Sequence, residues 1–190
     1  MNKKYKAILG ILALAGGIAL AVIAYDWLSE RTDAPHNVAD TIPQPETQQT
    51  EGSPTPDFTM YDTYGNEVRL SDFFGKPIVL NFWTTWCPAC VREMPYFEDL
   101  YYEMGDEIHI LKVNLLDGQR QTREIVDNFM ADRGYNFPIF FDTGSGAALY
   151  GVRSIPLTLF INADGYEVNR ILGSANADTL RRGLAYAGVR

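Results

Sequence analysis

The chain contains two cysteines, and they stand close together in Cys87-Pro88-Ala89-Cys90. A Cys-x-x-Cys pair can exchange disulfides, supply half of a zinc site, or form an inert disulfide. A structural zinc site normally needs four protein ligands, and this chain could add only His36 and His109. With no third cysteine, a scaffold of several disulfides is excluded, and no other thiol can mispair with the two. The pattern therefore favours redox chemistry, with zinc binding and an inert disulfide as the alternatives.

The surrounding residues predict that the pair lies where a strand passes into a helix. An apolar run, Ile78–Trp83, precedes it, and Met94, Phe97, Tyr101 and Met104 follow at helical spacing. Cys87 is thus expected at or just before the first helical turn. Unpaired N–H groups and the helix dipole there favour thiolate, lowering a thiol pKa from about 8.5 into a range of about 3.5 to 7.5. Cys90, one turn further on, should be more buried, so we expect Cys87 to attack and Cys90 to resolve.

Several short motifs together resemble one family. They are Asn81-Phe82-Trp83, Trp86-Cys87-Pro88-Ala89-Cys90, Glu93, Pro95 and Ser154-Ile155-Pro156. Residues from about 54 to 188 resemble the thioredoxin superfamily, and more closely its membrane-anchored TlpA/ResA-like branch of thiol-disulfide oxidoreductases. The resemblance implies an α/β thioredoxin fold, with a central mixed β-sheet flanked by helices and an N-terminal β-hairpin extension. It implies no cofactor and no metal.

The resemblance also implies roles for residues around the cysteines. Glu93 would take up the proton of the resolving thiol, the alternative being an ordinary solvated carboxylate. Ile155-Pro156 matches the family's cis-proline dipeptide, whose backbone an incoming peptide could pair with. The residues expected to tune the redox couple or contact substrate are Trp86, Pro88, Ala89, Ile155 and Pro156. Asn81 stands where cytoplasmic thioredoxins carry a buried acid, so this chain departs from an ordinary thioredoxin.

The N-terminal residues have the pattern of a membrane segment. Lys3, Lys4 and Lys6 precede an apolar run at residues 7–24, which as a helix spans about 27 Å at ~1.5 Å per residue. Lysines before the run and acids after it predict a single-pass segment in the bacterial cytoplasmic membrane, with the N-terminus inside. We expect an uncleaved signal anchor over residues 1–28. A cleaved signal peptide and a buried soluble helix are the alternatives.

The rest of the chain divides into two parts. Residues 29–55 lack periodicity and are rich in Pro, Thr and Gln, so they are predicted to be a disordered tether. Residues 56–190 are predicted to be the thioredoxin-like domain. Its expected strands are 58–62, 68–70, 78–83, 108–113, 137–141, 156–161 and 167–172. Its expected helices follow the cysteine motif and cover 71–76, 124–133, 146–150 and 177–187.

These features lead us to expect a thiol-disulfide oxidoreductase that faces the extracytoplasmic side and reduces disulfides of exported proteins. By resemblance, its clients would include apocytochrome c, and a membrane thiol transporter of the CcdA/DsbD kind would supply electrons. A net charge of −8 argues against a nucleic-acid partner. The alternatives are a disulfide-donating oxidase, a thiol peroxidase and a non-catalytic redox sensor. The peroxidase motif Pro-x-x-x-Thr-x-x-Cys lacks its proline before Cys87.

Overall fold

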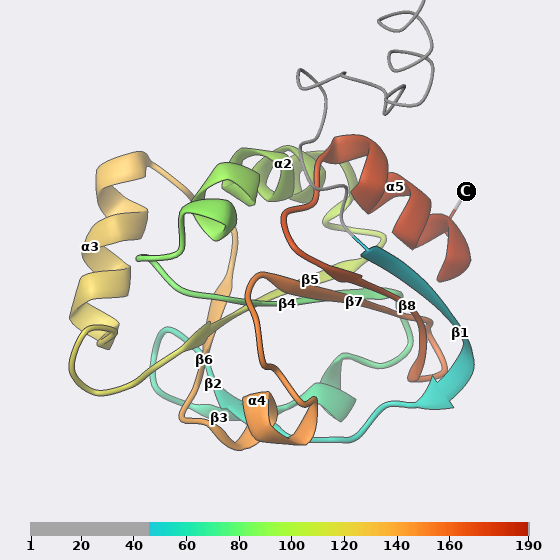
Figure 1. Cartoon of the computed structure of the whole chain (residues 1–190), viewed down its shortest axis with the longest axis horizontal. Coiled ribbons are helices and arrows are strands. Elements are labelled where there is room, and N and C mark those ends of the chain that lie inside the picture. Colours follow the sequence, from blue (N-terminus) through green and yellow to red (C-terminus); the bar gives the residue numbers. More distant parts are fainter. Residues whose placement is uncertain (1–45, 190) are drawn as a thin grey trace, which may run out of the picture. The chain divides into compact units, whose positions relative to one another are not determined.

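The computed structural model describes residues 46–189, and all structural statements below concern that part of the chain. One mixed sheet runs through it in the order β1-β8-β7-β4-β5-β6-β2-β3 (Figure 1). The strands are β1 (Glu46–Pro54), β2 (Thr59–Tyr61), β3 (Glu67–Arg69), β4 (Ile78–Trp83), β5 (His109–Leu115), β6 (Ile139–Asp142), β7 (Leu157–Ile161) and β8 (Tyr166–Leu172). The helices are η1 (Leu70–Phe73, a 3₁₀ turn), α2 (Pro88–Met104), α3 (Arg123–Arg133), α4 (Ser145–Leu149) and α5 (Ala177–Tyr186).

The three strands at the centre, β4, β5 and β7, carry the cysteine site. Strand β4 pairs parallel with β5 and antiparallel with β7, so that Leu80 lies between Leu111 and Leu159. Every residue of β4 is buried. A strand covered on both faces has no solvent side, which explains why its residues are apolar on both faces, with Asn81 as the one polar exception.

Two apolar layers cover the two faces of the sheet. One packs beneath α2, α3 and α5 and includes Val79, Trp83, Phe97, Val126, Phe160 and Leu184. The other lies against η1, α4 and the first hairpin and includes Phe58, Leu80, Phe82, Leu111, Tyr150 and Leu159. Figure 1 shows α2 and α5 on one side of the sheet and α4 on the other. The predicted fold, a mixed sheet flanked by helices, is confirmed.

The predicted N-terminal hairpin is also present, as β2 and β3. The carboxylate of Asp62 accepts hydrogen bonds from the N–H groups of Tyr64 and Asn66, each at 2.8 Å, and so closes the turn. Gly65 adopts φ 88°, a conformation that glycine reaches without steric cost. Because Tyr61 pairs with Phe141 of β6, the hairpin extends the main sheet.

The predicted tether ends earlier than expected, because residues 46–54 form strand β1. This strand pairs antiparallel with β8, with Glu46 opposite Leu172 and Pro54 opposite Tyr166. Strand pairing uses main-chain N–H and C=O groups, so an edge strand can form without apolar alternation. The lack of apolar periodicity in residues 46–54 therefore does not exclude a strand at the sheet edge.

The predicted anchor, residues 1–28, and the first part of the predicted tether lie outside the described residues. From residue 46 to residue 189, no helix combines the length and the apolar character needed to cross a bilayer.

Candidate active site

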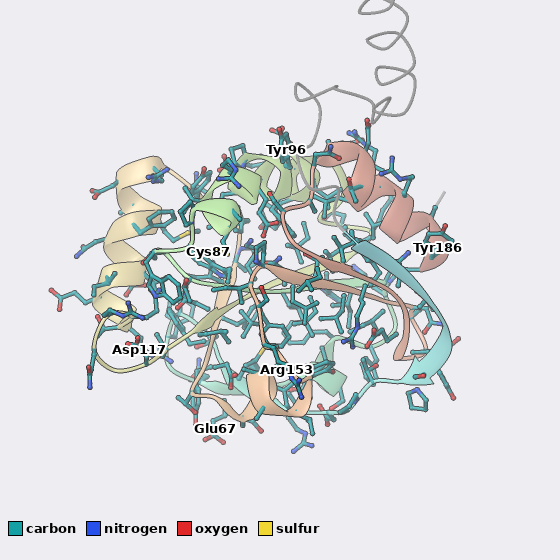
Figure 2. All side chains as sticks on the ribbon, viewed as in Figure 1. Glu67, Cys87, Tyr96, Asp117, Arg153 and Tyr186 are labelled. Atoms are coloured by element: carbon teal, nitrogen blue, oxygen red, sulfur yellow. A yellow bond between two sulfur atoms is a disulfide. The ribbon has the colours of Figure 1, made fainter. Side chains whose placement is uncertain are left out.

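Strand β4 and helix α2 place the two cysteines at one end of the central strands. Cys87 is the N-cap of α2, and its Sγ accepts a hydrogen bond from the Cys90 N–H at 3.2 Å. Pro88 is the first helical residue, where the lack of an N–H costs nothing. Figure 2 shows Cys87 at this helix start, with Tyr96 further along the outer side of the same helix.

The two sulfurs are joined in a disulfide with the Cα atoms 5.3 Å apart. Cys87 remains 5% exposed and Cys90 is fully buried, so a substrate sulfur can reach only the first. Within residues 46–189, no group of three His, Cys, Asp or Glu side chains is placed to hold a metal. The predicted asymmetry of an accessible and a buried thiol is present.

Trp86 forms an exposed border beside the disulfide. Its side chain is 50% exposed, and the Arg120 guanidinium lies 5.0 Å from the centre of one of its rings. Between the cysteines, Pro88 is exposed and Ala89 is half-buried on the first turn of α2. These residues form the surface that an approaching peptide would meet.

The loop before β7 completes the site from the other side. The Ile155-Pro156 peptide bond is cis, as the resemblance implied. The Ile155 carbonyl oxygen lies 3.7 Å from the Cys87 Sγ. Pro156 is buried, while Ile155 is half-buried. Segments almost seventy residues apart thus meet at one sulfur.

Glu93 lies inside the protein, so the alternative of a solvated carboxylate is wrong. Its side chain is fully buried, and its Oε1 accepts hydrogen bonds from Asn81 Nδ2 at 2.9 Å and from Lys112 Nζ at 3.3 Å. Its Oε2 accepts the Ala175 N–H at 3.1 Å. Burial raises the pKa of Glu93, while the charge of Lys112 and these hydrogen bonds oppose the rise.

Lys112 is a site residue that the sequence reasoning missed, because it lies within the apolar run that predicted β5. Its side chain is fully buried, and Nζ donates to Asn81 Oδ1 at 2.7 Å as well as to Glu93. Burial lowers the pKa of Lys112 to about 8, and the Glu93 carboxylate limits the fall. A lone lysine inside a run of buried residues is itself a signal, since lysine is almost never fully buried without a partner.

Comparisons with known proteins agree with this geometry. Residues 52–166 match the family model described as the AhpC/TSA family. The thiol-disulfide oxidoreductase ResA of Bacillus subtilis (strain 168) is 37% identical over 126 residues, which cover 65% of this chain and 68% of that protein.

Two solved structures are similar as well. The exposed lipoprotein thioredoxin Etrx1 of Streptococcus pneumoniae strain TIGR4 is 31% identical with a TM-score of 0.61, covering 68% of this chain and 98% of that one. StoA of Bacillus subtilis is 27% identical with a TM-score of 0.60, covering 68% of this chain and 96% of that one. Together with the buried Cys90, the accessible Cys87 and the cis Pro156, these matches show that the chain belongs to the AhpC/TSA family and is a ResA-like thiol-disulfide oxidoreductase of thioredoxin-like fold.

Proposed function

We propose that this oxidoreductase reduces disulfide bonds in exported proteins, apocytochrome c among them, on the extracytoplasmic face of a bacterial cytoplasmic membrane. The observation that carries the proposal is the unequal burial of the two cysteines, with Cys87 5% exposed and Cys90 fully buried. Only the accessible sulfur can attack a folded or partly folded client, and only the enclosed one is held beside it to finish the reaction.

The reaction begins from the reduced pair. The Cys87 thiolate attacks a client disulfide, forming a mixed disulfide and releasing one client sulfur as a thiolate. Cys90 then loses its proton to Glu93 and attacks the Cys87 sulfur, so that the bond to the client breaks and the intramolecular disulfide forms. The client gains two electrons, and the protein loses them.

The backbone around Ile155 supports a peptide client. Its carbonyl lies 3.7 Å from Cys87 Sγ and precedes strand β7, so an extended peptide crossing the site could pair with this segment. The half-exposed Trp86 would contact the same peptide from the opposite border.

The disulfide-donating oxidase is the second candidate. Strong oxidants of this fold stabilise the reduced form, in which the attacking thiol has a low pKa, so the reduction potential of the Cys87–Cys90 pair distinguishes the two directions.

The proposed location rests on residues 1–28. Lysines before the apolar run and acids after it support an uncleaved single-pass anchor with the N-terminus inside. A reductase on the outer side needs electrons from within, and a membrane thiol transporter of the CcdA/DsbD kind would supply them.

A trapping experiment with the full chain tests the client class. Cys90→Ser should accumulate a mixed disulfide with an oxidised Cys-x-x-Cys-His segment of apocytochrome c, because the resolving thiol is gone. Cys87→Ser should neither trap the segment nor reduce it, since the remaining Cys90 thiol is buried. A Cys87→Ser protein that reduces the segment as fast as wild type would refute the proposal. Faster consumption of hydrogen peroxide than of the disulfide would favour a thiol peroxidase.

A further inference from the structure

Lys112 of β5 and Glu93 of α2 form a fully buried ion pair, and the Lys112 ammonium has a partner for each of its N–H groups. The Lys112 ammonium has three N–H donors, and three acceptors surround it: Asn81 Oδ1 at 2.7 Å, Glu93 Oε1 at 3.3 Å and the face of the Phe97 ring at 4.0 Å. Trp83 adds a second ring at 5.4 Å. The site is thus shaped for a charged ammonium rather than for an apolar side chain.

We infer that Lys112 is a positioning residue for disulfide exchange, whose ammonium holds the Glu93 side chain as a carboxylate ready to accept the Cys90 proton. The inference rests on the exchange chemistry of Cys87 and Cys90, not on any client or on the reducing direction.

The need for a cation follows from burial. A carboxyl group in an apolar interior favours its neutral form, and a protonated Glu93 has no free capacity to take another proton. An opposite charge within about 4–6 Å lowers a carboxyl pKa by about 1–3 units. Lys112 Nζ, at 3.3 Å, lies within that range. Its charge therefore opposes the effect of burial and lowers the pH at which Glu93 becomes a base.

The proton balance closes over one cycle. When the mixed disulfide resolves, the Cys90 thiol gives its proton to Glu93, the Cys87–Cys90 bond forms and the bond between Cys87 and the client sulfur breaks. When donor thiols later reduce the disulfide, Glu93 returns the proton to the Cys90 sulfur. Lys112 neither gains nor loses a proton, so it acts through Glu93 alone.

The groups facing Glu93 make this assignment specific. Strand β5 contributes the charged Lys112. The helix that carries Glu93 also carries the titratable Cys90, three residues earlier in the chain. Strand β4 contributes the neutral Asn81, and the segment before α5 contributes the Ala175 N–H. Asn81 Nδ2 also donates to the neutral Thr158 Oγ1 of β7 at 2.8 Å. Within the described residues, Lys112 is thus the cation hydrogen-bonded to this carboxylate.

The test is the pH dependence of mixed-disulfide resolution in the full chain, measured by stopped flow after loading Cys87 with glutathione. In wild type, the resolution rate should fall at low pH as Glu93 becomes protonated, and we call this fall the acid limb. Lys112→Met removes the charge and should move the midpoint of the acid limb upward by about 1–3 pH units. Lys112→Arg keeps the charge, so its acid limb should stay close to that of wild type. Glu93→Gln should abolish the limb, and adding Lys112→Met to it should cause no further shift. Lys76→Met, which removes an exposed lysine bound to the Asp106 carbonyl, is the matched control and should leave the profile unchanged.

Two results would overturn the inference: an acid limb of Lys112→Met that coincides with wild type, or a rate that falls by one factor at every pH. The second would mean a packing role only. If Lys112→Met does not fold, Lys112→Gln supplies an uncharged side chain that can still donate to Asn81. Wild-type protein that resolves no glutathione disulfide at any pH would instead refute the exchange activity itself.

Discussion

At the scale of single residues, Asp57 organises the chain between β3 and η1. Its carboxylate accepts hydrogen bonds from Arg69 Nε and Nη2 at 2.9 and 2.7 Å, and from the Ser71 N–H and hydroxyl at 3.0 and 2.8 Å. Partial burial would raise the pKa of Asp57, but these hydrogen bonds outweigh it and hold the pKa below its ordinary value of 3.8.

We predict that Asp57→Asn lowers the free energy of unfolding by about 1 kcal/mol at pH 7, since four hydrogen bonds to a charge are weakened. Because the folded-state pKa lies below the unfolded one, the unfolded chain takes up the proton first as the pH falls. The stability that Asp57 contributes is thus present above pH 3.8 and is lost as the pH falls through the folded-state pKa. Urea unfolding of both proteins at pH 7 and pH 3 should therefore give a smaller difference at the lower pH. Equal differences would contradict this account.

At the scale of elements, α5 packs directly on β7 and β8. Gly183 faces the sheet, and a Cβ at this position would collide with the Phe160 ring. The close approach lets Leu180 and Leu184 enter the apolar layer beneath α2 and α3. Asn176 begins the helix by accepting the Thr179 N–H at 2.9 Å.

Gly183→Ala tests this contact. Alanine favours a helix over glycine by about 1 kcal/mol, but the collision with Phe160 should cost about 1–3 kcal/mol and prevail. We expect urea unfolding to show a less stable protein, and Phe160→Leu in the same chain to recover part of the loss. Ala185→Gly, at an exposed position of α5, is the control and should lose only the helix preference. A Gly183→Ala protein more stable than wild type would show that the helix can move away from the sheet.

At the scale of the whole molecule, local patterns predicted most elements. Apolar runs gave the bounds of β4, and Gly134, with φ 70°, ends α3 as its position implied. Strand β1 escaped prediction because residues 46–54 lack apolar alternation, while their antiparallel pairing with β8 needs only main-chain N–H and C=O groups. The Lys112 ion pair escaped because it depends on the register that sets Asn81 opposite Lys112, which only the folded sheet reveals.

The central claim is that Cys87 and Cys90 form a reducing couple, and its reduction potential is the most direct test. The full chain would be equilibrated with glutathione or dithiothreitol buffers and the oxidised fraction measured. Our account predicts a potential near or below about −250 mV, on the thioredoxin side of the scale. A value near about −120 mV, typical of a strong disulfide donor, would contradict it and make the protein an oxidase.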